Sequence, residues 1–288
     1  MSTNTRNDDL RSALVVGVIV AALTGIGTAI SVPVGIATGL GAATTAIIMV
    51  ALEVYRRLRS HAVEAMAAQL NASKQTEALG ALYALLSPRA PLLPLGGWAA
   101  SADLLTVLVD QVKRREPTLV VEASSGTSTV AIGYALQQRG HGRVVSLESS
   151  PEWAEETRRQ VRAHGLEDVA SVIDAPLRAY EIDGETWRWY DLEQVELDHP
   201  IDLLVIDGPP GTIQPLARFP AVPLLWDHLS SSVTIVADDG ARPDEAEMVT
   251  RWTQVHPELS STYLELEKGA FVLHRAPGDV SVDGRTPA

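Results

Sequence analysis

The sequence predicts an α/β protein with a doubly wound, mostly parallel sheet and a C-terminal antiparallel hairpin, preceded by an α-helical transmembrane hairpin. After residue 95, short apolar runs typical of strands alternate with helix-forming segments. Nearly every strand-like run ends in a carboxylate. Before them, residues 13–52 carry no charge at all. The first two observations predict the sheet, and the third predicts the membrane segment.

The composition excludes several classes of protein. The chain has 288 residues, a net charge of -13 and no cysteine. Disulfides and thiolate metal sites are therefore excluded. Binding to nucleic acid depends on a basic surface, so we expect no nucleic-acid partner.

The charge-free segment is long enough for two spans. A helix of this length would reach roughly 60 Å, about twice the thickness of a bilayer core. Pro33 interrupts the helical pattern, which predicts spans at 13–31 and 34–54 joined by a short turn. A secretory signal peptide and a buried soluble hairpin are the alternatives.

The arginines flanking these spans predict their orientation. None lies in the turn, and those outside the spans are Arg6, Arg11, Arg56, Arg57 and Arg59. Because positive residues tend to stay inside, we expect a two-span cell-membrane protein whose termini and C-terminal folded domain are cytoplasmic. Small residues recur every four positions at Gly17, Ala21, Gly25, Gly35, Gly39 and Ala43. They would pack the hairpin or form a homo-oligomer.

The chain is therefore predicted to have five parts. A tail (1–12), the hairpin (13–54), a helical stalk (55–87), a folded domain (88–276) and a disordered tail (277–288) follow in that order. Pro88, Pro91 and Pro94 mark the boundary between the stalk and the folded domain.

Within the folded domain, strands and helices alternate. Helix 101–115 is predicted from the helical spacing of Leu104, Leu105, Leu108 and Val112. Continuous apolar runs predict parallel strands at 118–123, 143–148, 170–175, 201–208 and 232–239. The intervening segments predict helices at 127–139, 151–164, 214–229 and 243–256. Residues 261–275 are expected to form a hairpin around Lys268-Gly269.

The carboxylates at the strand ends predict a ligand site. They are Glu122, Glu148, Asp174, Asp207 and the pair Asp238-Asp239. Ligands of such sheets lie beyond the carboxyl ends of the strands. Any one of these residues alone could instead be a helix cap. The small residues Ser124-Ser125-Gly126 after the first strand would let a ligand approach the backbone, and Glu148 could accept from a ribose diol. NAD fits these two features too, but no G-x-G-x-x-G is present.

Five motifs point to a known family. They are "GGWAAS" (96–101), "DAPL" (174–177), "WRWYDL" (187–192), "IDLLVIDGPPG" (201–211) and "ADDGARPDE" (237–245). Over roughly 88–275 the chain resembles the class I S-adenosylmethionine-dependent methyltransferases, in particular a small O-methyltransferase-like group. The resemblance implies a Rossmann-like methyltransferase fold and S-adenosylmethionine as cofactor.

The resemblance also implies roles for individual residues. The cofactor's methionine part would lie on Glu122, Ser124, Ser125, Gly126, Thr127 and Ser128, its ribose on Glu148 and Ser149, and its adenine on Asp174 and Ala175. Asp207 would lie beside the methyl group. Ser124 stands where relatives usually have a glycine. If this position needs a positive φ, the serine costs roughly 1 kcal/mol or more.

The acidic residues at the last two strands suggest how the acceptor is activated. In catechol-type O-methyltransferases similar positions hold a divalent metal, so Asp207, Asp238 and Asp239 are candidate ligands for Mg²⁺ or another divalent cation. Those enzymes also carry a lysine base where this chain has Pro210. The alternative is a metal-free site with Asp207 or Asp239 as general base.

Three aromatic positions have two interpretations each. Trp98 could close over the cofactor or be a structural tryptophan. Trp187, Trp189 and Tyr190 could wall the acceptor or simply pack together.

The sequence therefore predicts a membrane-tethered methyltransferase. We expect O-methylation of a small-molecule, sugar or lipid-linked envelope-precursor acceptor. Two alternatives remain: an aminopropyltransferase-like enzyme, and a non-catalytic membrane scaffold that kept the fold.

Overall fold

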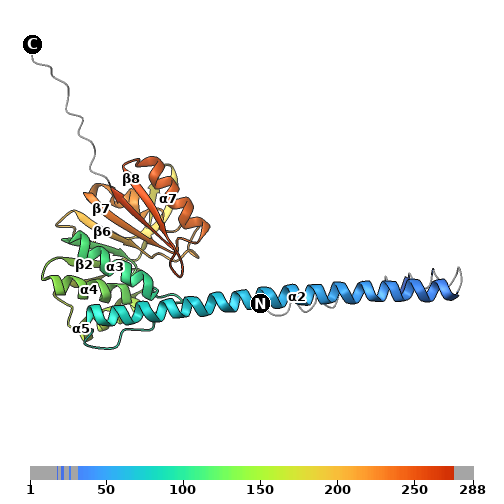
Figure 1. Cartoon of the computed structure of the whole chain (residues 1–288). Coiled ribbons are helices and arrows are strands. Elements are labelled where there is room, and N and C mark those ends of the chain that lie inside the picture. The colour runs from blue at the N-terminus through green and yellow to red at the C-terminus, as the bar shows by residue number, and fades with distance from the viewer. Residues whose placement is uncertain (1–17, 19–20, 23–25, 27–31, 276–288) are drawn as a thin grey trace, which may run out of the picture. The chain divides into compact units, whose positions relative to one another are not determined.

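The N-terminal part of the structure is one long helix, α2 (Val32–Leu86). The computed structural model describes residues 18, 21–22, 26 and 32–275 (Figure 1). Pro33 lies in the first turn of α2, where its missing N–H breaks no intrahelical hydrogen bond. The predicted second span (34–54) and the predicted stalk therefore belong to one uninterrupted helix.

The predicted membrane segment is only partly described. Among the residues with assigned structure, no helix combines the length and the apolar character needed to cross a bilayer. The predicted first span lies outside the described residues except for positions 18, 21, 22 and 26. The predicted tails 1–12 and 277–288 also lie outside them. The turn predicted between the spans, at Val32 and Pro33, is wrong, because both residues begin α2.

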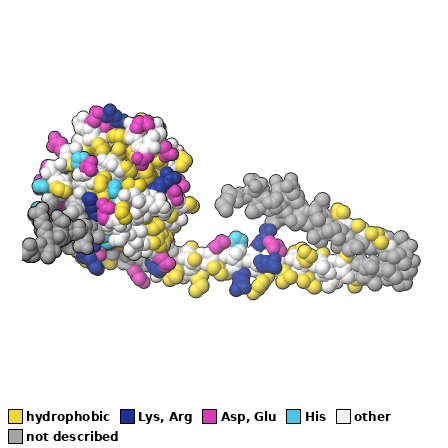
Figure 2. All heavy atoms as spheres, turned by 90° about the horizontal axis from the view of Figure 1, so that it is seen from above, with side chains coloured by type: hydrophobic (Ala, Val, Ile, Leu, Met, Phe, Trp, Pro, Cys, Tyr) yellow, Lys and Arg dark blue, Asp and Glu magenta, His cyan; other side chains and the backbone are white. Residues whose placement is uncertain are grey.

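The chain divides into two compact units, Met1–Leu70 and Asn71–Ala288. In the first unit, α2 carries exposed apolar side chains, among them Ile47 and Ile48 (Figure 2). In the second unit, Leu82 and Leu86 from the end of α2 are fully buried in the hydrophobic core. The C-terminal end of the predicted stalk therefore packs within the unit that contains the sheet.

A seven-stranded sheet organises the second unit (Figure 1). Its strands are β1 (Leu119–Ala123), β2 (Arg143–Glu148), β3 (Ala170–Asp174), β6 (Ile201–Ile206), β7 (Leu229–Asp238), β8 (Leu259–Leu264) and β9 (Ala270–Arg275). Their order is β3-β2-β1-β6-β7-β9-β8. The first five are parallel, and β9 is antiparallel to both neighbours. The predicted doubly wound sheet and its closing hairpin are confirmed.

Alternate residues of the strands face two hydrophobic cores. Val120 and Leu203 belong to the core shared with α3 (Ala102–Arg115), α4 (Thr127–Arg139) and α5 (Pro151–His164). The other core, which includes Val121 and Leu204, is shared with α6 (Ala221–Leu225) and α7 (Pro243–Val255). Because both faces are covered, the strands read as continuous apolar runs.

The structure corrects one predicted helix and adds a hairpin. The helix expected at 214–229 is reduced to α6 and a 3₁₀ turn, η1 (Trp226–His228). Three prolines lie in that segment, at positions 215, 220 and 223, and they prevent a longer helix. Strands β4 (Leu177–Ile182) and β5 (Glu185–Tyr190) form a separate antiparallel hairpin that the sequence analysis did not assign.

Candidate active site

The turn after β1 leaves open space above its backbone. Ser124 has a φ of 101°, a conformation that favours glycine. Its N–H donates to the carbonyl of Leu147 at 2.9 Å, which fixes the turn against β2. A Cβ added to Gly126 would meet nothing within 4 Å. Thr127 and Ser128 begin α4 behind this turn and are buried. The turn therefore has open space beside its backbone at Gly126.

Glu122 supports the turn from within the protein. Its side chain is fully buried, and Oε2 accepts from Thr129 Oγ1 and from Ser146 Oγ, both at 2.6 Å. Burial raises the pKa of Glu122, while the hydroxyl hydrogen bonds oppose the shift. The predicted cofactor residue Glu122 thus lies beneath the turn, where it joins β1, α4 and β2.

Glu148 closes the turn from the neighbouring strand. Its Oε2 accepts from both the backbone N–H and the hydroxyl of Ser125, each at 3.2 Å, and its Oε1 accepts from the N–H of Ser150 at 2.9 Å. Ser149, between them in sequence, is partly buried. The end of β2 and the turn after β1 are therefore held together through one carboxylate.

The end of β3 lies beside Glu148. Asp174 pairs in register with Glu148 and forms an ion pair with Arg158, whose Nη2 lies 2.9 Å from Oδ2. Ala175 is buried, and its N–H donates to the carbonyl of Glu148 at 2.8 Å. The predicted ribose and adenine residues are therefore neighbours at one edge of the sheet.

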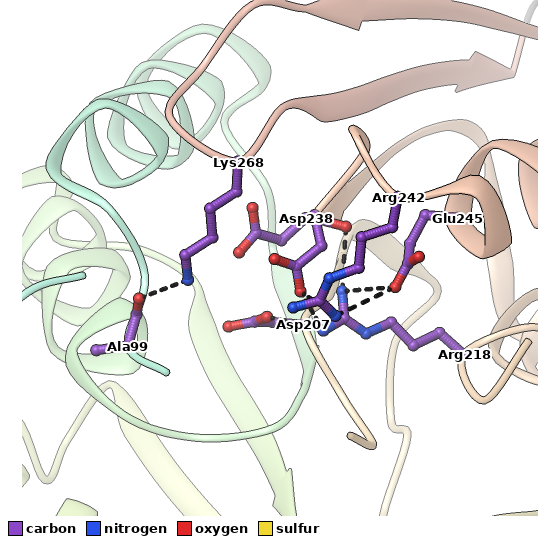
Figure 3. Close-up of polar contacts among 8 residues, drawn as sticks. Ala99, Asp207, Arg218, Asp238, Arg242, Glu245 and Lys268 are labelled. Atoms are coloured by element: carbon purple, nitrogen blue, oxygen red, sulfur yellow. Dashed lines mark hydrogen bonds and ion pairs between the residues drawn. The ribbon is translucent and has the colours of Figure 1, made fainter. Parts of the chain in front are cut away.

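Three carboxylates converge at the ends of β6 and β7, as predicted. Oxygen atoms of Asp207, Asp238 and Asp239 all lie within 4.8 Å of one another (Figure 3). Burial raises the pKa of Asp207 well above its usual range, and Arg218 opposes the shift. Burial also raises the pKa of Asp238, followed by the charge of Asp239. This convergence is the geometry from which a metal site or a general base was predicted.

A buried arginine that the sequence analysis missed lies inside this cluster. Arg218 follows β6 in the segment that is not helical, and only 5% of its side chain is exposed. Its Nη2 donates to Asp239 Oδ2 at 2.6 Å and to Asp207 Oδ1 at 3.3 Å. Burial alone would lower the pKa of Arg218, but Asp207, Asp239 and Glu245 raise it.

These contacts bear on the predicted divalent cation. Asp239 Oδ2 also contacts Arg242 Nη1 at 2.9 Å, so this oxygen already serves two guanidinium groups. Asp238 is buried, and neither of its carboxylate oxygens has a hydrogen-bond partner among the described residues. A dication on the same oxygens would be repelled by Arg218. The donor set therefore suits a metal poorly while the arginine stays in place.

Tyr190, at the end of β5, is one of the three aromatic residues predicted either to wall the acceptor or to pack together. It is buried, and no described residue hydrogen-bonds to its hydroxyl. Burial raises its pKa well above the usual range, followed by the charges of Glu148 and Asp207. The hydroxyl therefore stays protonated between the cofactor turn and the acidic cluster. The hairpin that carries it was itself not predicted.

The tryptophans for which a ligand contact and a structural role were both predicted differ in burial. Trp187 and Trp189 are buried in the hydrophobic core, which supports packing rather than an acceptor wall. Trp98 is 85% exposed, on a loop whose residue Ala99 accepts from Lys268 Nζ at 2.9 Å. Beside the acidic cluster, a cavity of about 290 Å³ is lined by residues that include Leu216, Arg218, Arg242, Glu245 and Met248.

Comparisons with known proteins bear on the fold and on the family. Residues 123–240 match a family model described as a methyltransferase domain. No curated protein sequence matches the chain. A solved structure of the SAH-bound methyltransferase PaMTH1 from Podospora anserina has a TM-score of 0.54 and 16% identity, covering 74% of this chain and 96% of its own.

Two further solved structures are similar over the same region. The O-methyltransferase from Bacillus cereus in complex with SAH gives a TM-score of 0.47 and 19% identity, covering 71% of this chain and 91% of its own. TomG from Streptomyces achromogenes, in complex with SAM, gives 0.47 and 14%, with coverages of 70% and 89%. The chain has the Rossmann-like methyltransferase fold, and the family match supports an S-adenosylmethionine-dependent methyltransferase.

Proposed function

We propose that this chain is an S-adenosylmethionine-dependent O-methyltransferase. The observation that carries the proposal is the carboxylate of Glu148, held by Ser125 beside a turn with open space above Gly126. A carboxylate at this position suits the two hydroxyl groups of a ribose, and the open turn admits a ligand close to the backbone. The methyltransferase family match and the SAH bound to PaMTH1 support the same cofactor.

The residues present fit the cofactor in three parts. The turn from Ser124 to Ser128, above the buried Glu122, would hold the methionine part. Glu148 and Ser149 would hold the ribose, and Asp174 with Ala175 would hold the adenine. When bound, S-adenosylmethionine supplies a methyl group on a positively charged sulfur.

Asp207 is the residue best placed to act as general base. Asp239 is buried and contacts both Arg218 and Arg242, whereas Asp207 has a 16% exposed side chain and one long contact with Arg218. Asp207 would accept the proton of the acceptor hydroxyl as the oxygen forms its bond to the methyl carbon. Bound S-adenosylmethionine would supply that methyl group, and the electron pair of the carbon–sulfur bond would remain with its sulfur.

The acceptor is proposed to be a small hydroxyl-bearing molecule, free or lipid-linked. The cavity of about 290 Å³ beside Arg218 offers space for part of such a molecule. Incubating the full chain with methyl-labelled S-adenosylmethionine and fractionated small-molecule and lipid extracts tests this proposal. Label that enters a base-stable ether supports O-methylation. Label found only on nitrogen or sulfur would contradict it.

We also propose that residues 13–54 attach the chain to the cell membrane, with the catalytic domain on the cytoplasmic side. The charge-free sequence and the exposed apolar side chains of α2 support this, and Arg56 and Arg59 follow directly. The small-residue positions of this segment would pack the spans or join two copies. Resistance of the membrane-bound chain to carbonate washing is expected. Its complete release by high salt would contradict the proposal.

A non-catalytic scaffold is the second candidate, and one observation favours it. Ser124 adopts a positive φ in the cofactor turn, where a glycine would be unstrained. A chain that binds neither S-adenosylmethionine nor S-adenosylhomocysteine would support the scaffold.

A further inference from the structure

Arg218 is a cation built into the acidic cluster. Its side chain is 5% exposed, and burying an unpaired guanidinium would be costly. It is instead surrounded by acceptors from two strand ends and one helix. Such burial is stable only when the opposing charges and the geometry are supplied by the fold.

The contacts of Arg218 join elements that are far apart in sequence. Nη2 contacts Asp207 after β6 and Asp239 after β7. Nη1 donates to the backbone carbonyl of Asp238 at 3.1 Å and lies 3.7 Å from Glu245 Oε1 on α7. Nε has no partner among the described residues. One guanidinium therefore fixes both strand ends and the start of α7 relative to one another.

The surrounding charges are nearly balanced without an added ion. Four carboxylates, those of Asp207, Asp238, Asp239 and Glu245, lie close to three cations, Arg218, Arg242 and Lys268. Figure 3 shows Lys268 on one side of Asp207 and Asp238 and the two arginines on the other side. The mutual repulsion that would otherwise call for a dication is therefore already offset.

We infer that Arg218 is a positioning residue that takes the place of a divalent cation, so that Asp207 and Asp239 are held without a metal. The inference deepens the proposed function and rests on it for the identity of the reaction. The absence of a metal can be tested separately from the reaction, because metal binding can be measured without any acceptor or cofactor.

The two possible roles of Arg218, stabilising the fold and taking the place of a metal ion, predict different results when the residue is replaced. If Arg218 only stabilises the fold, its loss should lower the melting temperature and leave metal binding unchanged. If it replaces a metal, its loss frees carboxylate oxygens of Asp207 and Asp239 beside the unpartnered Asp238. The emptied cluster should then bind a dication that the wild-type chain rejects.

The experiment titrates Mn²⁺ into the full-length chain and follows the free ion by electron paramagnetic resonance. We expect no stoichiometric Mn²⁺ binding by the wild type. The affinity of Arg218→Met for Mn²⁺ should exceed that of the wild type by roughly tenfold or more, because one close like charge is removed. Adding Asp238→Asn to Arg218→Met should abolish the gain. Arg218→Lys, which keeps the charge, should bind no Mn²⁺.

Stoichiometric Mn²⁺ binding by the wild type would overturn the inference, and so would a folded Arg218→Met that gains none. If Arg218→Met does not fold, Arg218→Gln, which also removes the charge, takes its place in the titration. A calorimetric titration of the same wild-type sample with S-adenosylhomocysteine separates the two proposals. Absence of S-adenosylhomocysteine binding would contradict the proposed function without changing the Mn²⁺ result.

Discussion

The hydroxyl of Tyr190 and the Cα of Gly208 are in direct contact. A Cβ built on Gly208 would lie 2.2 Å from Tyr190 Oη and 3.0 Å from the Cβ of Ser124. A glycine is therefore required where the loop after β6 passes the cofactor turn. This contact joins the β4–β5 hairpin, the first turn and the acidic strand end into one site.

Gly208→Ala should destabilise the protein by about 1–3 kcal/mol, the usual cost of forcing an extra carbon into a packed site. Gly211→Ala is the matched control in the same loop, because a Cβ there meets nothing within 4 Å. Urea unfolding of both variants measures the difference. Equal effects of the two substitutions would contradict the close contact.

Tyr190→Phe should weaken binding of S-adenosylhomocysteine while changing the melting temperature little. No described residue hydrogen-bonds to this hydroxyl, so its removal leaves no protein partner unsatisfied. A ligand hydrogen bond lost here would cost about 0.5–1.5 kcal/mol in calorimetry.

Tyr134→Phe is the control for this prediction. Tyr134 Oη accepts from the N–H of Arg89 at 2.7 Å and lies 2.8 Å from His164 Nδ1. It should therefore lose stability and keep its affinity. If both variants showed the same changes in stability and in affinity for S-adenosylhomocysteine, a ligand contact of Tyr190 would be excluded.

Ser124→Gly should stabilise the protein by about 1 kcal/mol, since relief of a positive φ outweighs the added freedom of the unfolded chain. Ser149→Gly serves as control, because Ser149 is not among the residues with positive φ. It should lower the melting temperature slightly. A melting temperature that falls in Ser124→Gly would show that the serine is not strained.

Glu122→Gln should change how stability depends on pH. Burial raises the pKa of Glu122 in the folded chain above the ordinary 4.5. The group therefore stabilises the folded state fully below pH 4.5, and this contribution is lost as pH rises through the raised pKa. The melting temperature of the variant minus that of the wild type should therefore be larger at pH 8 than at pH 4.5.

The exposed Glu152→Gln is the control for the pH series, and its difference from wild type should vary less with pH. A Glu122→Gln difference that stays constant across the series would contradict a raised pKa.

Much of the fold could be predicted because local patterns determine it. The bounds of α4, α5 and β2 agree with the predicted ones, since apolar runs and caps such as Ser150 and Gly165 are local signals. The β4–β5 hairpin also has a local sequence signal. Asp183-Gly184 is a two-residue turn between alternating strands.

The site was less predictable, because burial and pairing depend on tertiary structure. The convergence of Asp207, Asp238 and Asp239 followed from adjacent strand ends. Nothing in the local sequence around Arg218, between Pro215 and Pro220, indicates that its side chain is buried among those carboxylates. Likewise, Glu122 was correctly placed at a strand end, but its orientation into the core required the packing of Thr129 and Ser146.

Titration calorimetry of the full chain with S-adenosylhomocysteine tests the central claim most directly. We predict saturable binding that Glu148→Ala weakens by roughly 1–3 kcal/mol, the cost of losing a charge-assisted hydrogen-bond acceptor. The exposed Glu167→Ala should bind like the wild type. No heat and no thermal shift with either S-adenosylhomocysteine or S-adenosylmethionine, in a folded wild-type sample, would contradict the proposed methyltransferase.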